Sequence, residues 1–161
     1  MSEGSRAALS LAPMAREWAE MVAGWRYEPP FDVYDGRPEV VASLLDGNHL
    51  GVLEDGELVG FVAVGEECRV PGGPTDDTAT DLGIGIRPDR RGEGLGTRAC
   101  SLLFEALALA GHVRLRVSVL ASNDWSLALA LRLGFRERGE FLDERDGRRF
   151  LVLERELLEA P

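Results

Sequence analysis

A basic, glycine-rich segment, Arg90–Thr97 (RRGEGLGT), has the residue types of a phosphate-binding turn. It follows Asp81–Ile86, which alternates small and apolar residues as a strand does, and it leads into Leu95–Ala110, whose apolar residues recur at helical spacing. The first N–H groups of a helix lack backbone partners and lie at its positive end, where anions bind. Glycines at 92, 94 and 96 lack side chains that would keep a diphosphate away, and Arg91 adds positive charge. We therefore predict a site for a phosphorylated ligand, with an ordinary glycine-rich turn as the alternative.

The spacing of these glycines argues against the two best-known phosphate loops. A P-loop carries lysine followed by serine or threonine after its last glycine, and Leu95-Gly96-Thr97 contains no lysine. A Rossmann loop reads GxGxxG with an acidic residue about 20 positions further on, whereas the spacing here is GxGxG and position 116 is arginine. What remains is Arg-x-x-Gly-x-Gly, formed by Arg91, Gly94 and Gly96 at the entrance to a helix.

That pattern resembles the acetyl-CoA pyrophosphate loop of the GNAT family of N-acetyltransferases. A second segment, Asn123–Phe135, resembles the other signature of the family, an asparagine that opens a helix and a Leu-Gly-Phe exit into a strand. Asn123 or a neighbour can cap that helix, Gly134 can end it, and its nearly all-round apolar character predicts burial. Two segments in the right order are much harder to obtain by chance than one. The resemblance covers Asp81–Phe135 strongly and the flanking segments weakly.

The remaining elements form a mixed α/β pattern. Asp55-Gly56 and Asp146-Gly147 predict hairpin turns, and Val70–Thr80 is the longest irregular stretch. We predict strands over 9–11, 49–53, 58–64, 81–86 and 113–119, after Phe135 and over 150–153, and helices over 15–23, 38–45, 95–110 and 124–133. The resemblance implies the acyl-CoA N-acyltransferase fold, a mixed, mostly antiparallel, twisted sheet of about seven strands flanked by helices. A length of 161 residues suits one N-acetyltransferase domain over 1–161.

Composition narrows the function classes. The chain has 28 acidic and 18 basic residues, a net charge of −10, which argues against nucleic-acid binding. No run approaches the roughly 20 apolar residues of a membrane span, and the N-terminus lacks the apolar region of a signal peptide. Cys68 and Cys100 match no metal spacing, and His49 and His112 have no ligand-like companions, so we expect no metal. Reduced thiols and a cytoplasmic location are the expectation.

The resemblance implies that acetyl-CoA is the co-substrate and that its pantetheine arm pairs with a strand backbone as an added strand does. A backbone N–H of that strand would also stabilise the tetrahedral oxyanion. Gly83 and Gly85 lie on one face of the strand, where they either leave room for a ligand or mark a bulge. Asn123 would contact the cofactor arm, cap its helix, or do both. The implied cofactor-binding residues are Ile84, Gly85, Ile86, Arg91, Gly92, Glu93, Gly94, Leu95, Gly96, Thr97 and Asn123.

The catalytic groups depart from the family pattern. Many members carry a tyrosine seven residues after the asparagine, aimed at the sulfur, but position 130 here is alanine. Ser126, one turn earlier on the same face, is a weak substitute as general acid, with helix packing as its alternative role. Glu66 is our first choice of general base, followed by Glu67 and Asp81. Burial would have to raise the pKa of such a carboxyl, and solvated acidic groups at strand ends are the alternative.

The acceptor is an amine that the sequence does not identify. The aromatic residues Trp25, Tyr27, Phe31 and Tyr34 either line the acceptor pocket, as this region commonly does in the family, or belong to the core. Acidic residues (Glu66, Glu67, Asp76 and Asp77) favour a cationic small molecule such as a polyamine, an aminoglycoside or an amino acid derivative. The alternatives are a protein N-terminal or lysine acetyltransferase, and a CoA-binding module without catalysis. The oligomeric state stays open, and a homodimer is compatible with the resemblance.

Overall fold

The computed structural model describes residues 7–157, which contain seven strands hydrogen-bonded in the order β1-β2-β3-β4-β5-β7-β6. The strands are β1 (Leu9–Pro13), β2 (His49–Glu54), β3 (Glu57–Val64), β4 (Thr80–Ile86), β5 (Arg114–Leu120), β6 (Arg136–Leu142) and β7 (Arg149–Glu156). The helices are α1 (Arg16–Ala23), α2 (Val40–Leu44), α3 (Leu95–Leu109) and α4 (Asp124–Arg132), with short 3-10 turns η1 (Phe31–Tyr34), η2 (Glu66–Cys68) and η3 (Pro88–Arg90).

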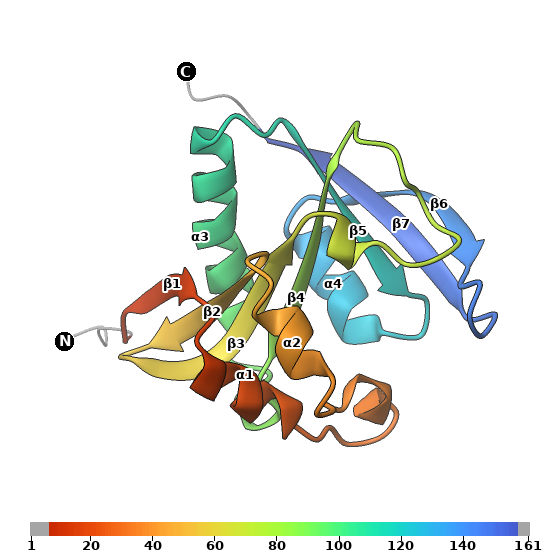
Figure 1. Cartoon of the computed structure of the whole chain (residues 1–161). Coiled ribbons are helices and arrows are strands. Elements are labelled where there is room, and N and C mark those ends of the chain that lie inside the picture. The colour runs from red at the N-terminus through yellow and green to blue at the C-terminus, as the bar shows by residue number, and fades with distance from the viewer. Residues whose placement is uncertain (1–6, 158–161) are drawn as a thin grey trace. The chain divides into compact units, whose positions relative to one another are not determined.

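The predicted sheet is confirmed as mixed, mostly antiparallel and flanked by helices (Figure 1). Strands β4 and β5 run parallel, whereas β1 with β2, β5 with β7, and β6 with β7 pair antiparallel. Every predicted strand and helix is present, with ends shifted by up to three residues. The sequence did not predict the three 3-10 turns, because such short turns have no hydrophobic period of their own.

The chain forms two compact units. Unit 1 comprises the residues up to Val62 together with Ile84–Leu103. Unit 2 comprises Ala63–Gly83 and the residues from Phe104 onward. Strands β3 and β4 and helix α3 therefore each contribute residues to both units.

Unit 1 has a core built on the amphipathic helix α1. Ala19 and Val22 of that helix are buried with Trp25, Leu44 and Leu58. The ring of Trp25 stacks on that of Phe61, with 6.2 Å between the centroids. The β2–β3 hairpin turns at Asp55 (φ 51°) and Gly56 (φ 83°), as the Asp-Gly pair predicts, since this turn needs positive φ at both residues.

Unit 2 is organised around β5. Its antiparallel ladder with β7 runs from Arg114 opposite Glu156 to Leu120 opposite Phe150, and Asp81 of β4 lies opposite Arg116 on its other side. Leu115 of β5 and Leu153 of β7 are almost completely buried. Strand β6 pairs with β7 and is otherwise largely exposed.

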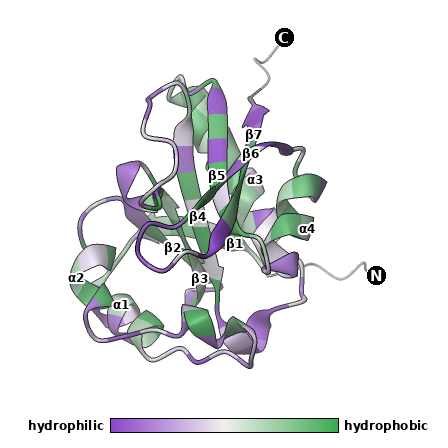
Figure 2. Cartoon of the chain, turned by 90° about the vertical axis from the view of Figure 1, so that its right-hand side faces the viewer, coloured by the Kyte–Doolittle hydropathy of each residue, from purple (hydrophilic) through white to green (hydrophobic). Residues whose placement is uncertain are grey.

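The predicted burial of α4 is wrong for part of the helix. Figure 2 shows the run of hydrophobic residues along it, yet only Leu129 and Ala130 are buried, and Leu131 is 60% exposed. The physical reason is that apolar residues are not confined to interiors, because a folded protein has too little polar surface to cover itself. An all-round apolar sequence therefore overstates how much of a short helix is covered.

Candidate functional site

The glycine-rich turn adopts the geometry expected of an anion site. After η3 the chain bends over residues 91–94, and α3 begins at Leu95, where the Arg98 N–H donates to the Gly94 carbonyl at 3.2 Å. Gly92 (φ 81°) and Gly94 (φ 78°) are in the left-handed region, and a Cβ added to either would meet nothing within 4 Å. No side chain of the described protein fills the space beside these two glycines. We call residues 91–97 the glycine loop.

The charges around the glycine loop partly neutralise one another. Arg90 Nη2 lies 2.6 Å from a carboxylate oxygen of Glu54 on β2 and 2.8 Å from one of Glu93. Arg98 Nη1 lies 3.6 Å from Glu54, and the hydrogen bond from Arg90 holds the pKa of Glu54 below its ordinary value. The neighbouring Arg87 pairs with Glu57 at 3.1 Å and with Asp89 at 2.6 Å, so the formal charges in this part of unit 1 are close to balanced.

Arg91 lies against two aromatic rings of the N-terminal segment. Its guanidinium carbon is 4.4 Å from the centroid of Phe31 and 5.7 Å from that of Tyr27. The Tyr27 hydroxyl donates to the Ile86 carbonyl at 2.7 Å, and burial raises the pKa of Tyr27 to about 12. Trp25 belongs to the core, as the alternative role predicted. Sequence reasoning missed the contact with Arg91, because no local pattern connects residues so far apart in the chain.

The space beside Gly85 is occupied by the protein itself, whereas Gly83 has only ordinary contacts beside it. A Cβ on Gly85 would lie 2.4 Å from Cε1 of Phe61, so this glycine accommodates the Phe61 ring. A Cβ on Gly83 would lie 3.6 Å from the Cys68 sulfur and 3.9 Å from the Ala63 side chain. The Phe61 side chain therefore covers this face of β4 at Gly85. The predicted backbone pairing of Ile84, Gly85 and Ile86 does not depend on that face, although the Ile86 carbonyl already accepts the Tyr27 hydroxyl.

In unit 2, Asn123 caps α4, which is one of the two roles predicted for it. Its Oδ1 accepts a hydrogen bond from the Ser126 N–H at 3.1 Å, and its Nδ2 donates to Ser126 Oγ at 2.9 Å. The structure thus places these two predicted site residues in contact. Ser126 Oγ takes part in the helix cap, in agreement with a structural role. Ala130, where the family's tyrosine would stand, is 6% exposed.

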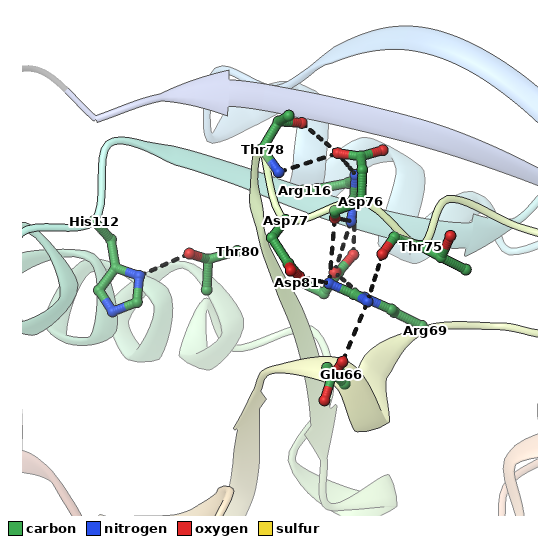
Figure 3. A network of polar contacts seen from close by, with 10 residues as sticks. All are labelled: Glu66, Arg69, Thr75, Asp76, Asp77, Thr78, Thr80, Asp81, His112 and Arg116. Atoms are coloured by element: carbon green, nitrogen blue, oxygen red, sulfur yellow. Dashed lines mark hydrogen bonds and ion pairs between the residues drawn. The ribbon is translucent and has the colours of Figure 1, made fainter.

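Asp81 is held between two arginines (Figure 3). Its two carboxylate oxygens accept from Arg116 Nε and Nη2, both at 2.8 Å, and one of them also accepts from Arg69 Nε at 2.9 Å. Asp81 and Arg116 are both buried, and the Asp81 hydrogen bond raises the pKa of Arg116. Both oxygens of this buried carboxylate are therefore already bound by arginines of the protein. These contacts favour a structural role for Asp81 over that of general base.

The other acidic candidates lie at the exposed edge of this network. Glu66 is 83% exposed and contacts Arg69 at 3.5 Å, so it is not the buried carboxyl that we predicted for a general base. Hydrogen bonds from Thr78 and Arg116 lower the pKa of Asp76 to about 2. The network contains four carboxylates and two arginines, which gives it a formal charge of −2. The arginines are Arg69 and Arg116, and the carboxylates are those of Glu66, Asp76, Asp77 and Asp81.

The predicted site residues are divided between the units. Unit 1 holds Ile84–Ile86 and the glycine loop, and unit 2 holds Glu66, Asn123 and Ser126. Within unit 1, Tyr27 contacts Ile86 while its ring lies beside Arg91, which brings the end of β4 and the start of the glycine loop together.

Comparisons with known proteins identify the family of the chain. A family model described as the acetyltransferase (GNAT) family matches residues 13–135. No curated protein gives a significant match. Along residues 7–157, none of the helices has the length and hydrophobicity needed to cross a membrane.

Solved structures share the fold. A protein provisionally named a phosphinothricin N-acetyltransferase is 23% identical with a TM-score of 0.73, over 94% of this chain and 100% of that chain. A provisionally assigned acetyltransferase from Salmonella typhimurium, solved with its cofactor acetyl-CoA, is 14% identical with a TM-score of 0.67, over 95% and 96%. The ribosomal-protein-S18-alanine N-acetyltransferase from Escherichia coli is 17% identical with a TM-score of 0.67, over 96% and 97%.

Proposed function

Because the chain belongs to the acetyltransferase (GNAT) family, we propose that it transfers the acetyl group of acetyl-CoA to a primary amine of a small-molecule acceptor. Family membership makes it an acetyltransferase with acetyl-CoA as co-substrate. The main structural observation in support of the proposal is the open glycine loop at the start of α3. The nature of the acceptor, the cofactor-binding residues and the acid and base are also proposed.

The glycine loop fits the diphosphate of coenzyme A. Gly92 and Gly94 leave the backbone uncovered, and the N–H groups at the start of α3 point out of the helix end. Arg91, the arginine of the glycine loop, adds a positive charge that favours an anion. Glu93 would contribute its backbone N–H, since its carboxylate pairs with Arg90. The bound cofactor would supply a thioester whose acyl group is transferred to the amine.

We assign the pantetheine arm to the backbone of Ile84, Gly85 and Ile86, with Asn123 as a further contact. Ile84 and Gly85 are partly exposed, so their backbone lies near the surface of unit 1. For proton transfer, Glu66 is the proposed base and Ser126 the proposed acid. Glu66 would act from an exposed position, directly or through water, and Ser126 would act from the helix cap.

The positions of the carboxylates in the described structure favour an acceptor with a weakly basic amine. Among the described residues, the buried carboxylates are Asp81 and Asp143, and each is bound by arginine. Without a buried carboxylate base, much of the acceptor must lose its proton to water. An α-amino group has a pKa of about 7.7–8.0 and is roughly a third neutral at pH 7.5, whereas a lysine-like amine is only about 0.1% neutral. The formal charge of −2 around Arg69 and Arg116 favours a cationic molecule, so an amino acid derivative satisfies both conditions.

A panel of amines tests this choice. We expect amino acid amides and other α-amines to release thiol from acetyl-CoA faster than polyamines or aminoglycosides, with kcat/KM rising as pH approaches the pKa of the amine. Faster turnover of polyamines would contradict the weak-base argument. Peptides with free N-termini separate a small-molecule enzyme from a protein acetyltransferase.

A CoA-binding module without catalysis is the second candidate. Three observations favour it. Position 130 is alanine, Glu66 is exposed, and the carboxylate of Asp81 is already bound by arginine. Tight CoA binding with no thiol release from any amine or peptide would support it. Because Ala130 is buried, an Ala130→Tyr variant needs a check of its fold before any gain in turnover is interpreted.

We further propose one functional domain over 1–161 in the cytoplasm. Cys100 is buried, and burial raises the pKa of its thiol to about 12, which keeps this cysteine unreactive and suits a reduced protein. A homodimer remains compatible with the proposal, and sedimentation with and without CoA measures the oligomeric state.

A further inference from the structure

Two aromatic residues support the start of the glycine loop from a distant part of the sequence. Phe31 lies in η1, and Tyr27 lies a few residues before it. Both rings lie beside the guanidinium of Arg91, at 4.4 Å for Phe31 and 5.7 Å for Tyr27. We call these two residues the aromatic shelf.

The aromatic shelf is itself fixed at two points. The Tyr27 hydroxyl donates to the Ile86 carbonyl at 2.7 Å, and the Tyr27 N–H donates to Asp35 Oδ1 at 2.7 Å. Ile86 is the last residue of β4, and the glycine loop begins after the short turn η3. The shelf therefore connects the end of β4 with the first residue of the glycine loop.

Stacking on a ring leaves the chemistry of arginine intact. A ring contacts the face of the guanidinium, whereas the five N–H donors lie in its plane and point outward. An arginine whose guanidinium carbon lies over a ring, as that of Arg91 does over Phe31, can therefore also donate hydrogen bonds to a phosphate oxygen. An arginine held by a ring before binding loses less rotamer freedom when the ligand arrives, so it binds more tightly than a freely rotating one.

We propose that Phe31 and Tyr27 are positioning residues that hold Arg91 for the diphosphate of acetyl-CoA. This inference rests on the proposed function. It assigns the two aromatic residues to cofactor binding rather than to the acceptor pocket that the sequence suggested. The part of η1 that carries Phe31 is then an extension of the cofactor site.

A double-mutant cycle on CoA affinity tests the proposal, with isothermal titration calorimetry on the full chain. Phe31→Leu removes the ring but keeps an apolar side chain, and Arg91→Leu removes the charge. We expect about fivefold weaker CoA binding for Phe31→Leu and about tenfold for Arg91→Leu. The double variant should bind like Arg91→Leu alone, because the ring acts only through the arginine. Phe31→Tyr, which keeps a ring, should bind like the wild type.

Val33→Ala in the same 3-10 turn is the matched control, since Val33 is 40% exposed. It should leave CoA affinity unchanged, and thermal unfolding should show that every variant is folded. If Phe31→Leu has no effect, or if its effect adds fully to that of Arg91→Leu, the positioning role is wrong. If the wild type itself does not bind CoA, the proposed function fails instead. With an active acceptor, Phe31→Leu should raise KM for acetyl-CoA and leave kcat unchanged.

Discussion

The glycine loop before α3 and the network around Asp81 differ in how far the protein itself satisfies their polar groups. In the loop, the backbone at Gly92 and Gly94 is uncovered, and the arginines and carboxylates beside it are close to balanced. In the network, the protein's own arginines bind both oxygens of Asp81, and the carboxylates outnumber them. A polar group is available to a ligand only where the protein does not already satisfy it. The loop is thus equipped for binding, whereas the buried part of the network is a scaffold.

The largest effect should come from breaking the buried ion pair of the network. Asp81→Asn leaves Arg116 without its full counter-charge, so we expect a loss of about 3–5 kcal/mol in the free energy of unfolding. Urea denaturation measures this loss. Asp77→Asn is the control, because Asp77 is 90% exposed and pairs with the same Arg69, and it should cost at most about 1 kcal/mol. A stable but inactive Asp81→Asn protein would show that Asp81 acts in catalysis after all.

The next largest effect should come from covering the glycine loop. In Gly94→Val the side chain would occupy the open space beside the helix start, so we expect CoA binding to weaken about a hundredfold, or by about 2.8 kcal/mol. Gly147→Val is the matched control, because Gly147 has nearly the same φ (77° against 78°) and also has nothing within 4 Å. Both variants should lose similar stability, about 1–3 kcal/mol, but only the first should lose affinity. Equal affinities by calorimetry would place the diphosphate elsewhere. Gly96 is a less clean position, since it is buried.

A smaller effect is expected at the exposed edge of the network. A positioned general base contributes about 10²–10⁴-fold, but Glu66 is 83% exposed and should contribute less, about tenfold in kcat/KM. Steady-state rates of Glu66→Gln measure this, with Asp77→Asn as the control for charge. A loss above a thousandfold would mean that bound substrate shields Glu66 from water. An unchanged rate would remove Glu66 from the mechanism.

The smallest effect should come from the charge balance of the glycine loop. Glu93→Gln removes the carboxylate that pairs with Arg90 and raises the local net charge by one. We expect CoA to bind about twofold to threefold more tightly at low salt, with the gain disappearing at high salt because exposed charges are screened. Weaker binding at low salt would show that the Arg90–Glu93 pair is needed for the shape of the loop.

Local sequence patterns predicted the backbone features well. The Asp55-Gly56 turn, the cap at Asn123 and the strand, glycine loop and helix around Gly94 all depend on residues close together in the chain. The pattern therefore contains the information that forms them. Local patterns also predicted the order of strands and helices along the chain. The family resemblance then indicated how these elements are arranged in the fold.

Contacts between distant residues were not predictable in this way. Arg116 and Asp81 are 35 residues apart, so nothing local showed that the candidate base was already bound. The space beside Gly85 is taken by Phe61, and Arg91 lies against Phe31, in each case through folding rather than through a motif. Side-chain roles depend on these long-range contacts, which is why the cofactor loop was easier to predict than the acid and base.

Amide chemical shifts during a CoA titration test the binding of the diphosphate most directly. In an ¹⁵N-labelled wild-type protein, we expect the largest shift changes at the N–H groups of residues 92–97, with a smaller response at Ile84 and Gly85. Largest changes outside the glycine loop, or no change at saturating CoA, would contradict the assignment of residues 92–97 as the diphosphate site.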